Sequence, residues 1–222
     1  MEDRLDLSTT QDGSSTVYSS KWDAHYHSTH GAIQESLHVF IKAGLDHWLS
    51  TTQSNHVSIL EYGMGTGLNV ILTQDFAQKA QIHIDYDTIE AYPLSDKIVS
   101  QLNYSTTTSL PPIDQIHHAP WDEKTTFHDF FHLTKYNRLF EDFESEKRYD
   151  VIFYDAFGPG AQPTLWEEPL LTQVVSMMAP GACLVTYCAQ GAFKRVLKKL
   201  GLEIERLPGP PGKREMTRAS KS

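Results

Sequence analysis

The feature that most constrains the fold is a glycine-rich turn that joins a predicted strand to a predicted helix. Apolar residues dominate positions 57–62, as in a buried strand, and residues 68–77 continue as a helix. Gly63, Gly65 and Gly67 lie between the two elements. Glycine lets the backbone approach a ligand closely, and the N-terminus of the following helix offers free N–H donors. The pattern therefore predicts a ligand-binding loop at one edge of an α/β sheet.

Strand and helix alternate along most of the chain, which is typical of a mostly parallel central sheet with helices on both faces. Further strands are predicted over residues 82–90, 149–156 and 182–188, the last two as near-continuous apolar runs. Further helices are predicted over residues 36–50, from Pro93, between Pro163 and Met178, and over residues 193–200. Residues 203–207 and 215–218 flank a turn rich in Pro and Gly, and they predict a C-terminal antiparallel hairpin.

Two stretches lack a regular pattern. Residues 1–35 are rich in Ser, Thr, Asp and His, and residues 104–120 are predicted to be a loop because prolines interrupt them. Pro180-Gly181 is expected to end the helix that precedes it. A chain of 222 residues that is 40% hydrophobic suits one globular domain. Within it we expect residues 1–50 to form an extension that packs on the core and helps to close the site, and residues 51–222 to form the main domain.

The chain carries no signal for membrane insertion or secretion. No run approaches the roughly 20 apolar residues of a membrane span, and the N-terminus has no basic-then-apolar leader. Cys183 and Cys188 stand an odd number of residues apart in a predicted strand, so they face opposite sides and cannot bridge each other. We therefore expect a reduced, cytoplasmic protein.

The sequence lacks the residue spacing that two common types of ligand-binding glycine turn require. A dinucleotide fingerprint needs G-x-G-x-x-G, but Leu68 or Val70 stands where the third glycine belongs. A phosphate loop needs Ser or Thr after its Gly-Lys pair, but Arg214 follows Gly212-Lys213. The pattern that remains, E-x-G-x-G-x-G, is the first motif of Rossmann-like methyltransferases that use S-adenosylmethionine (SAM).

A SAM site of this kind needs acidic partners beside the glycine turn. We expect Glu61 to engage the methionine ammonium, directly or through water. Glu90 ends the second predicted strand, and its carboxylate can accept hydrogen bonds from both ribose hydroxyls. Tyr26 is expected to help close the cleft. The predicted cofactor-binding residues are Tyr26, Glu61, Gly63, Met64, Gly65, Gly67, Asn69 and Glu90.

Asp155 lies at the carboxyl end of the third predicted strand, which is where ligands bind in open α/β sheets. The alternative is a helix-capping or turn aspartate, a common role for this residue. The loop that follows is rigid and aromatic, and we expect Phe157, Pro159 and Trp166 to line a substrate pocket.

With these motifs the sequence resembles a known family, the tRNA 5-aminomethyl-2-thiouridine methyltransferases, which complete a modified wobble uridine. The resemblance covers nearly the whole chain. It is carried by EYGMGTGLN (61–69), IEAYPLS (89–95), YDAFGPGAQPTLW (154–166) and the Lys-Arg-Glu-Met run at 213–216. Two positions depart from it: Met64 stands where phenylalanine is frequent, and Asn137 stands where many members have an acid beside the adenine.

The resemblance implies a Rossmann-like class I SAM-dependent methyltransferase. The enzyme would methylate the amine of 5-aminomethyl-2-thiouridine at the tRNA wobble position and give 5-methylaminomethyl-2-thiouridine. Asp155 would be the catalytic residue that holds the amine and accepts its proton. Some members are fused to a flavin-dependent oxidoreductase, and this chain resembles the stand-alone methyltransferase form.

The charge distribution bears on an RNA partner. The net charge is −9, but nine basic and three acidic residues follow position 191, so that segment carries +6 and the remainder −15. We expect Lys213 and Arg214 to contact phosphates of the anticodon loop. The alternatives are a solvated helix face with a frayed tail, or pairing of Arg214 with Glu215 or Asp155.

Other interpretations remain open. His128 and His132 stand at i, i+4 on a possible helix, close to a zinc pattern, but the required Glu and a third ligand are missing. His25, His27 and His30 also lack supporting acids or cysteines, so no metal is predicted. The alternative functions are a SAM-dependent methyltransferase of a small amine or catechol, and a non-catalytic RNA-binding protein that keeps the same fold.

Overall fold

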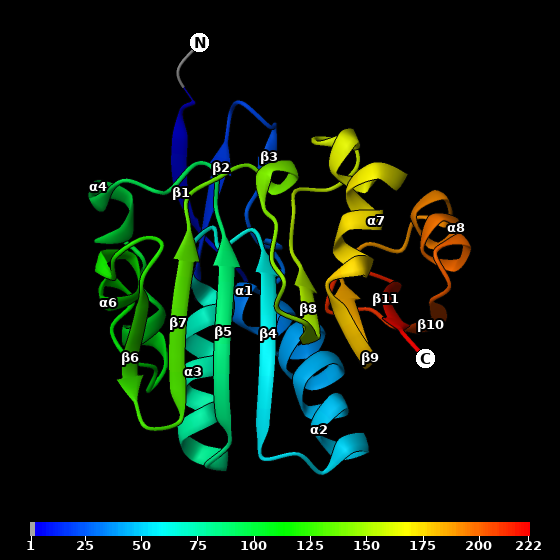
Figure 1. Ribbon diagram of the computed structural model, residues 1–222. Helices are drawn as coiled ribbons and strands as arrows, with labels where there is room; N and C mark the ends of the chain where they lie inside the picture. The colour runs from blue at the N-terminus through cyan, green and yellow to red at the C-terminus, as the bar shows by residue number, and fades with distance from the viewer. Residues whose placement is uncertain (1–2) are drawn as a thin grey trace.

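The computed structural model describes residues 3–222, and an eight-stranded sheet runs through it (Figure 1). The strand order is β10-β11-β9-β8-β4-β5-β7-β6. In that order the bounds are Glu203–Pro208, Glu215–Ser220, Met178–Thr186, Tyr149–Tyr154, His56–Tyr62, His83–Ile89, Phe131–Tyr136 and Lys124–His128. The pairings from β9 through β7 are parallel, whereas β6, β11 and β10 join antiparallel. The predicted mostly parallel sheet with a C-terminal hairpin is confirmed.

The order of the strands reverses beside β4. The chain adds β5 on one side of β4 and later returns to place β8 on the other side, which creates a topological switch point. Tyr62 of β4 and Tyr154 of β8 pair in register, and the N–H of Asp155 donates to the carbonyl of Tyr62 at 3.0 Å. Gly63 and Asp155 therefore leave neighbouring strands at the same end of the sheet.

Helices cover both faces of this sheet. One face carries a continuous helix made of α1 (Ala32–Ser36), the π-helical η1 (Leu37–Asp46) and α2 (His47–Thr52), together with α3 (Leu68–Ala80). The other carries α7 (Glu168–Ser176) and α8 (Gly191–Lys199). Phe153 packs in the first core with Phe40, whereas Tyr154 packs in the second with Phe193. Successive residues of β8 thus point to opposite cores, which explains its near-continuous apolar sequence.

The N-terminal residues form a second, three-stranded antiparallel sheet of β1 (Leu5–Thr9), β2 (Ser15–Ser19) and β3 (Ala24–His25). Its mostly polar residues gave no strand pattern in the sequence. Side chains distant in sequence hold it in place instead. Asn103 Oδ1 accepts hydrogen bonds from the N–H and the Oγ of Ser15, both at 2.8 Å, and the Tyr104 hydroxyl donates to the Ser15 carbonyl at 3.0 Å.

The predicted loop over residues 104–120 is wrong in part. It contains two short helices, α5 (Tyr104–Thr107) and α6 (Asp114–His118). Each is about one turn long, too short for a helical hydrophobic period to show in the sequence. Ile113 and Ile116 are buried, and they pack close to Gly67.

Several predicted boundaries also need correction. Pro180-Gly181 lies within β9 instead of ending a helix, because α7 has already ended at Ser176 and the pairing of β8 with β9 is irregular there. The helix expected from Pro93 begins at Asp96 as α4 (Asp96–Val99). His128 and His132 lie on the paired strands β6 and β7, not on one helix. The remaining elements are the short 3-10 helices η2 (Phe140–Asp142) and η3 (Pro163–Trp166). Within residues 3–222, no helix is long and apolar enough to cross a bilayer.

Candidate active site

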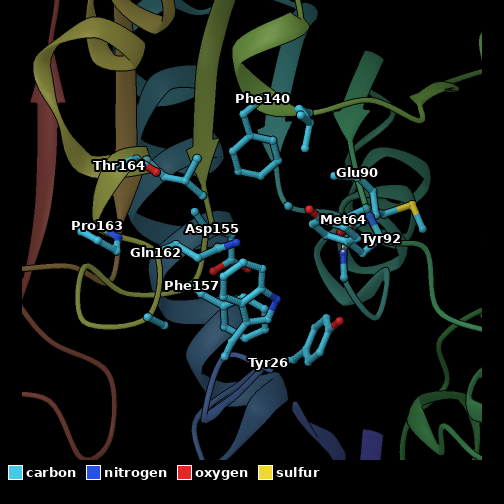
Figure 2. Close-up of a pocket in the computed structure, with 18 of the residues that line it drawn as sticks. Tyr26, Met64, Glu90, Tyr92, Phe140, Asp155, Phe157, Gln162, Pro163 and Thr164 are labelled. Atoms are coloured by element: carbon cyan, nitrogen blue, oxygen red, sulfur yellow. Dashed lines mark hydrogen bonds between the residues drawn. The ribbon is translucent and has the colours of Figure 1, made fainter. Parts of the chain in front are cut away.

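A cavity of about 250 Å³ opens where β4, β5 and β8 end (Figure 2). Each strand contributes the residues that directly follow it, and the N-terminal segment and the two 3-10 helices complete the wall. In Figure 2, Asp155 and Phe157 face this space from one side, while Met64 and Glu90 face it from the other. The cavity therefore lies at the switch point where α/β sheets bind their ligands.

The glycine turn is packed so tightly that larger residues do not fit. Gly63, Gly65 and Gly67 have φ values of +94°, +51° and +77°, a region that favours glycine. A Cβ added to Gly63 would lie 2.8 Å from the carbonyl oxygen of Asp155, and one added to Gly65 would lie 2.9 Å from the Tyr26 ring. The absence of side chains at these glycines thus lets β8 and the N-terminal segment pack against the turn.

Glu90 is buried directly after β5, and backbone donors fix its carboxylate. One oxygen accepts the N–H of Gly65 at 2.9 Å, and the other accepts the N–H of Tyr92 at 2.8 Å. Burial raises the pKa of Glu90, and these hydrogen bonds oppose the rise. Each carboxylate oxygen has a second lone pair, so Glu90 can still accept hydrogen bonds from a pair of hydroxyl groups in the cavity. Asn137 supports the same segment by donating to the Glu90 carbonyl at 2.8 Å.

A buried amide links two carboxyl groups behind the cavity wall. The Asn69 Nδ2, from the start of α3, donates to Glu61 at 3.0 Å and to Asp155 at 2.8 Å. Glu61 also accepts a hydrogen bond from the Thr88 hydroxyl at 2.7 Å. Glu61 is fully buried and does not line the cavity, so the structure places it as a partner of Asn69. Asn69 thereby fixes the orientation of the Asp155 carboxyl.

Asp155 is the carboxyl group of this network that faces the cavity. Burial raises its pKa well above the ordinary value, the neighbouring charge of Glu61 raises it further, and the Asn69 hydrogen bond opposes the rise. A carboxylate with a raised pKa is a stronger base than a solvated one. Asp155 is therefore suited to hold and deprotonate a cationic group in the cavity.

Aromatic side chains form the wall above Asp155. The ring of Phe157 meets that of Tyr26 edge-on at 4.9 Å and lies 6.3 Å from that of Trp22. Trp166 is buried beneath this loop, and its Nε1 donates to the Phe157 carbonyl at 2.8 Å. Trp166 therefore supports the wall, whereas Phe157 lines the cavity.

The cavity gathers about half of the residues predicted from the sequence. Those that line it are Tyr26, Gly63, Met64, Gly65, Glu90, Asp155 and Phe157. Those that do not are Glu61, Gly67, Asn69, Pro159, Trp166, Lys213 and Arg214. Sequence reasoning missed Trp22, Tyr92, Phe140 and Tyr187. Tyr92 stands within IEAYPLS (89–95), one of the segments that resemble the family, so a signal was available for it.

The basic C-terminal segment is more internally paired than its composition indicates. Its paired members are Lys194 with Glu215, Lys199 with Glu168, Lys213 with Glu35 and Arg218 with Glu205. Lys213 Nζ also lies 3.8 Å from the centre of the Tyr187 ring, so its ammonium is engaged within the protein and is poorly placed for a phosphate. Among residues 3–222, Arg214 forms no ion pair with Glu215 or Asp155, and its side chain is exposed. Arg195, Lys198 and Arg206 are likewise exposed and outside any ion pair of the described chain.

The histidines that the sequence singles out have separate hydrogen-bond partners. His27 is buried, and its Nε2 shares a hydrogen bond with the Thr66 hydroxyl at 2.7 Å; burial lowers its pKa to about 4. His128 Nε2 lies 3.3 Å from the carbonyl of Gln74. In the described part of the chain, no three His, Cys, Asp or Glu side chains are grouped as metal ligands. Cys183 and Cys188 are both free and buried.

Comparison with known proteins identifies relatives of this architecture. Residues 119–222 match a family described as S-adenosyl-L-methionine-dependent methyltransferase. Two relatives named tRNA 5-methylaminomethyl-2-thiouridine biosynthesis bifunctional protein MnmC are similar to nearly the whole chain. The one from Aromatoleum aromaticum is 30% identical over 96% of this chain and 34% of its own length; the one from Leptospira borgpetersenii is 28% identical over 90% and 33%. The chain thus spans about a third of the length of the curated relatives it matches.

Solved structures share the fold. MNMC2 from Aquifex aeolicus superimposes with a TM-score of 0.80 at 22% identity, over 100% of this chain and 71% of that one. DesVI from Streptomyces venezuelae has a TM-score of 0.52 at 11% identity, over 85% and 93%. The predicted fold of a class I SAM-dependent methyltransferase is confirmed. The family that residues 119–222 match is described as dependent on SAM, in agreement with the predicted cofactor.

Proposed function

We propose that this chain, a homologue of the methyltransferase part of MnmC, transfers a methyl group from SAM to the amine of 5-aminomethyl-2-thiouridine at the tRNA wobble position. The product would be 5-methylaminomethyl-2-thiouridine. The observation that carries the proposal is the position of Asp155, between the glycine turn and an aromatic wall. The printed names of the relatives supply the acceptor.

The residues around the glycine turn fit SAM. Gly63 and Gly65 line the cavity and carry no side chain, so a ligand can lie against the backbone there. Glu90 offers a carboxylate with free lone pairs for the ribose hydroxyls. Asn69 and Glu61 act indirectly in this proposal, because they lie behind the wall and hold Asp155.

Asp155 is the proposed catalytic residue. Bound SAM supplies an electrophilic methyl group, and the acceptor amine must be neutral to attack it because a protonated amine has no lone pair. Asp155 would hold the amine by a hydrogen bond and accept its proton directly or through water. Such positioning of reactants contributes about 7–11 kcal/mol in well-oriented reactions, and general-base assistance contributes about 10²- to 10⁴-fold.

The remaining roles concern access and RNA. We propose that the N-terminal extension closes the cavity, since Trp22, Tyr26 and His27 line it. Arg214 stays our candidate for a phosphate contact near the site. Lys213 becomes a support of the wall, because its ammonium pairs with Glu35 and packs on the ring of Tyr187, which lines the cavity. A tRNA substrate would place the protein in the cytoplasm.

The test is incubation with SAM carrying a labelled methyl group and tRNA isolated from cells that lack the final methylation, followed by nucleoside analysis. The expected result is label in 5-methylaminomethyl-2-thiouridine. If label is transferred only to small amines or catechols, the acceptor is a small molecule and not tRNA. If calorimetry shows no saturable SAM binding, the result would instead support a non-catalytic protein.

A further inference from the structure

We propose that Trp22 and Phe157 form a clamp that holds a single unstacked nucleobase over Asp155, and that Lys21 binds a phosphate beside that base. The inference rests on the proposed function, because it assigns the acceptor side of the same cavity. It goes beyond that function by naming the residues that recognise an RNA base instead of a free amine.

The spacing of the two rings suits a base. Their centroids lie 6.3 Å apart and their planes are inclined by 32°, so the two rings are tilted and not stacked on each other. Neighbouring bases in a duplex are separated by about 3.4 Å, so a base between two rings needs about twice that distance. To hold one base between them, the two rings would have to turn toward parallel planes at about that spacing. Trp22 and Phe157 are both partly exposed, and both line the cavity.

Two neighbours hold the Phe157 side of the clamp in place. Tyr26 meets the Phe157 ring edge-on at 4.9 Å, and the Trp166 indole donates to the Phe157 carbonyl at 2.8 Å. Phe157 follows Asp155 by two residues on the same loop. A base stacked on Phe157 would therefore carry a short side-chain amine within reach of the Asp155 carboxyl.

A cation stands at the rim of the clamp. Lys21 is exposed, and its Nζ lies 4.6 Å from the Trp22 ring centre and 3.9 Å from that of Tyr92. No ion pair within residues 3–222 engages this ammonium. Tyr92 is itself 49% exposed, so the cation and its two rings face solvent. A nucleotide whose base enters the clamp would bring its phosphate to this position, since a phosphate is joined to every base through the sugar.

The experiment compares Trp22→Ala and Trp22→Phe with the wild type, using tRNA that carries 5-aminomethyl-2-thiouridine. Stacking of one base on an aromatic side chain corresponds to a change of about 5- to 150-fold in affinity. We expect Trp22→Ala to raise the Kd and KM for tRNA by that factor, and Trp22→Phe to stay within about threefold of the wild type. Circular dichroism should give the wild-type spectrum for all three proteins, which shows that the variants are folded.

Lys21→Ala tests the phosphate contact, with the exposed Lys42→Ala on η1 as a matched loss of charge. For Lys21→Ala the slope of log K against log salt should become shallower by about 0.7, the value for one phosphate on a single strand. Lys42→Ala should keep the wild-type slope.

The outcomes separate this inference from the proposed function. If the wild type transfers no methyl group to this tRNA, the proposed function fails. If the wild type does so and Trp22→Ala keeps the wild-type KM for tRNA, the clamp alone is refuted. Equal damage by Trp22→Phe and Trp22→Ala would also refute it, because a phenyl ring can still stack. An unchanged salt slope for Lys21→Ala would remove the phosphate contact.

Discussion

The substitution Asp155→Asn is expected to lower kcat for methyl transfer by about 10²- to 10⁴-fold, the range of general-base assistance. The amide has nearly the shape of the carboxyl group, and its oxygen can still accept the 2.8 Å hydrogen bond from Asn69. The lower kcat would therefore reflect the lost basicity and charge of the side chain more than a change in its position. It corresponds to an increase of about 3–5 kcal/mol in the activation barrier at about 1.4 kcal/mol per tenfold.

The pH dependence gives this prediction a second readout. Burial and the charge of Glu61 raise the pKa of Asp155, so the wild-type rate should increase with pH as the carboxyl group loses its proton. Asp155→Asn lacks this ionisation. The pH–rate profile of the variant should therefore show only the ionisation of the acceptor amine. Single-turnover rates with labelled SAM across pH measure both effects.

The stability of the variant should move in the opposite direction to its activity. The folded-state pKa of Asp155 lies above the ordinary value of 3.8, so ionisation of this group costs the folded state stability as the pH rises above 3.8. Asp155→Asn should therefore melt at a higher temperature than the wild type at neutral pH, and the difference should shrink in acid. Wild-type turnover in the variant would remove Asp155 from the mechanism, and loss of SAM binding would show that its role is structural.

Three further substitutions test the surroundings of the site. Gly63→Ala should lower the free energy of unfolding by at least about 1–2 kcal/mol, measured by urea denaturation, because its φ is +94° and its Cβ would meet a backbone oxygen at 2.8 Å; Gly160→Ala, with nothing within 4 Å, is the control. Lys213→Met should cost about 1–3 kcal/mol by leaving buried Glu35 without its cation, and the added change Glu35→Gln should restore much of that. Glu90→Gln should weaken SAM binding by about 10- to 100-fold in calorimetry, the loss of a charge-assisted pair, and an unchanged Kd would exclude the ribose contact.

The sequence predicts those parts of the site that depend on short-range patterns, such as the residues that directly follow a strand. The glycine turn, Glu90 and Asp155 each follow a strand directly, and parallel strands end at the same edge of a sheet. Strand periodicity is therefore enough to bring these groups together. The same reasoning predicted the C-terminal hairpin and the doubly buried strand β8.

The parts that the sequence does not predict depend on contacts between distant residues. Composition alone assigned Lys213 to an RNA-binding patch, but its partner Glu35 lies 178 positions away. The N-terminal sheet is held through Asn103, 88 positions from Ser15, and its short strands contain too few apolar residues to show an alternating pattern. Glu61 was expected to contact the cofactor, but it points into the core, since both Asn69 and Thr88 donate to it there.

Asn69 connects the cofactor loop to the proposed catalytic residue. It follows the glycine turn by two residues at the start of α3, and its amide holds the carboxyl group of Asp155 at the end of β8. The proposed base is thus fixed to the same short segment that forms the cofactor loop. Gly63, packed against the backbone of Asp155, adds a second link between the two strands. Because a misplacement of 1 Å can cost about 10²-fold in rate, this double attachment would keep the proposed base in position relative to the methyl donor while the proposed clamp opens.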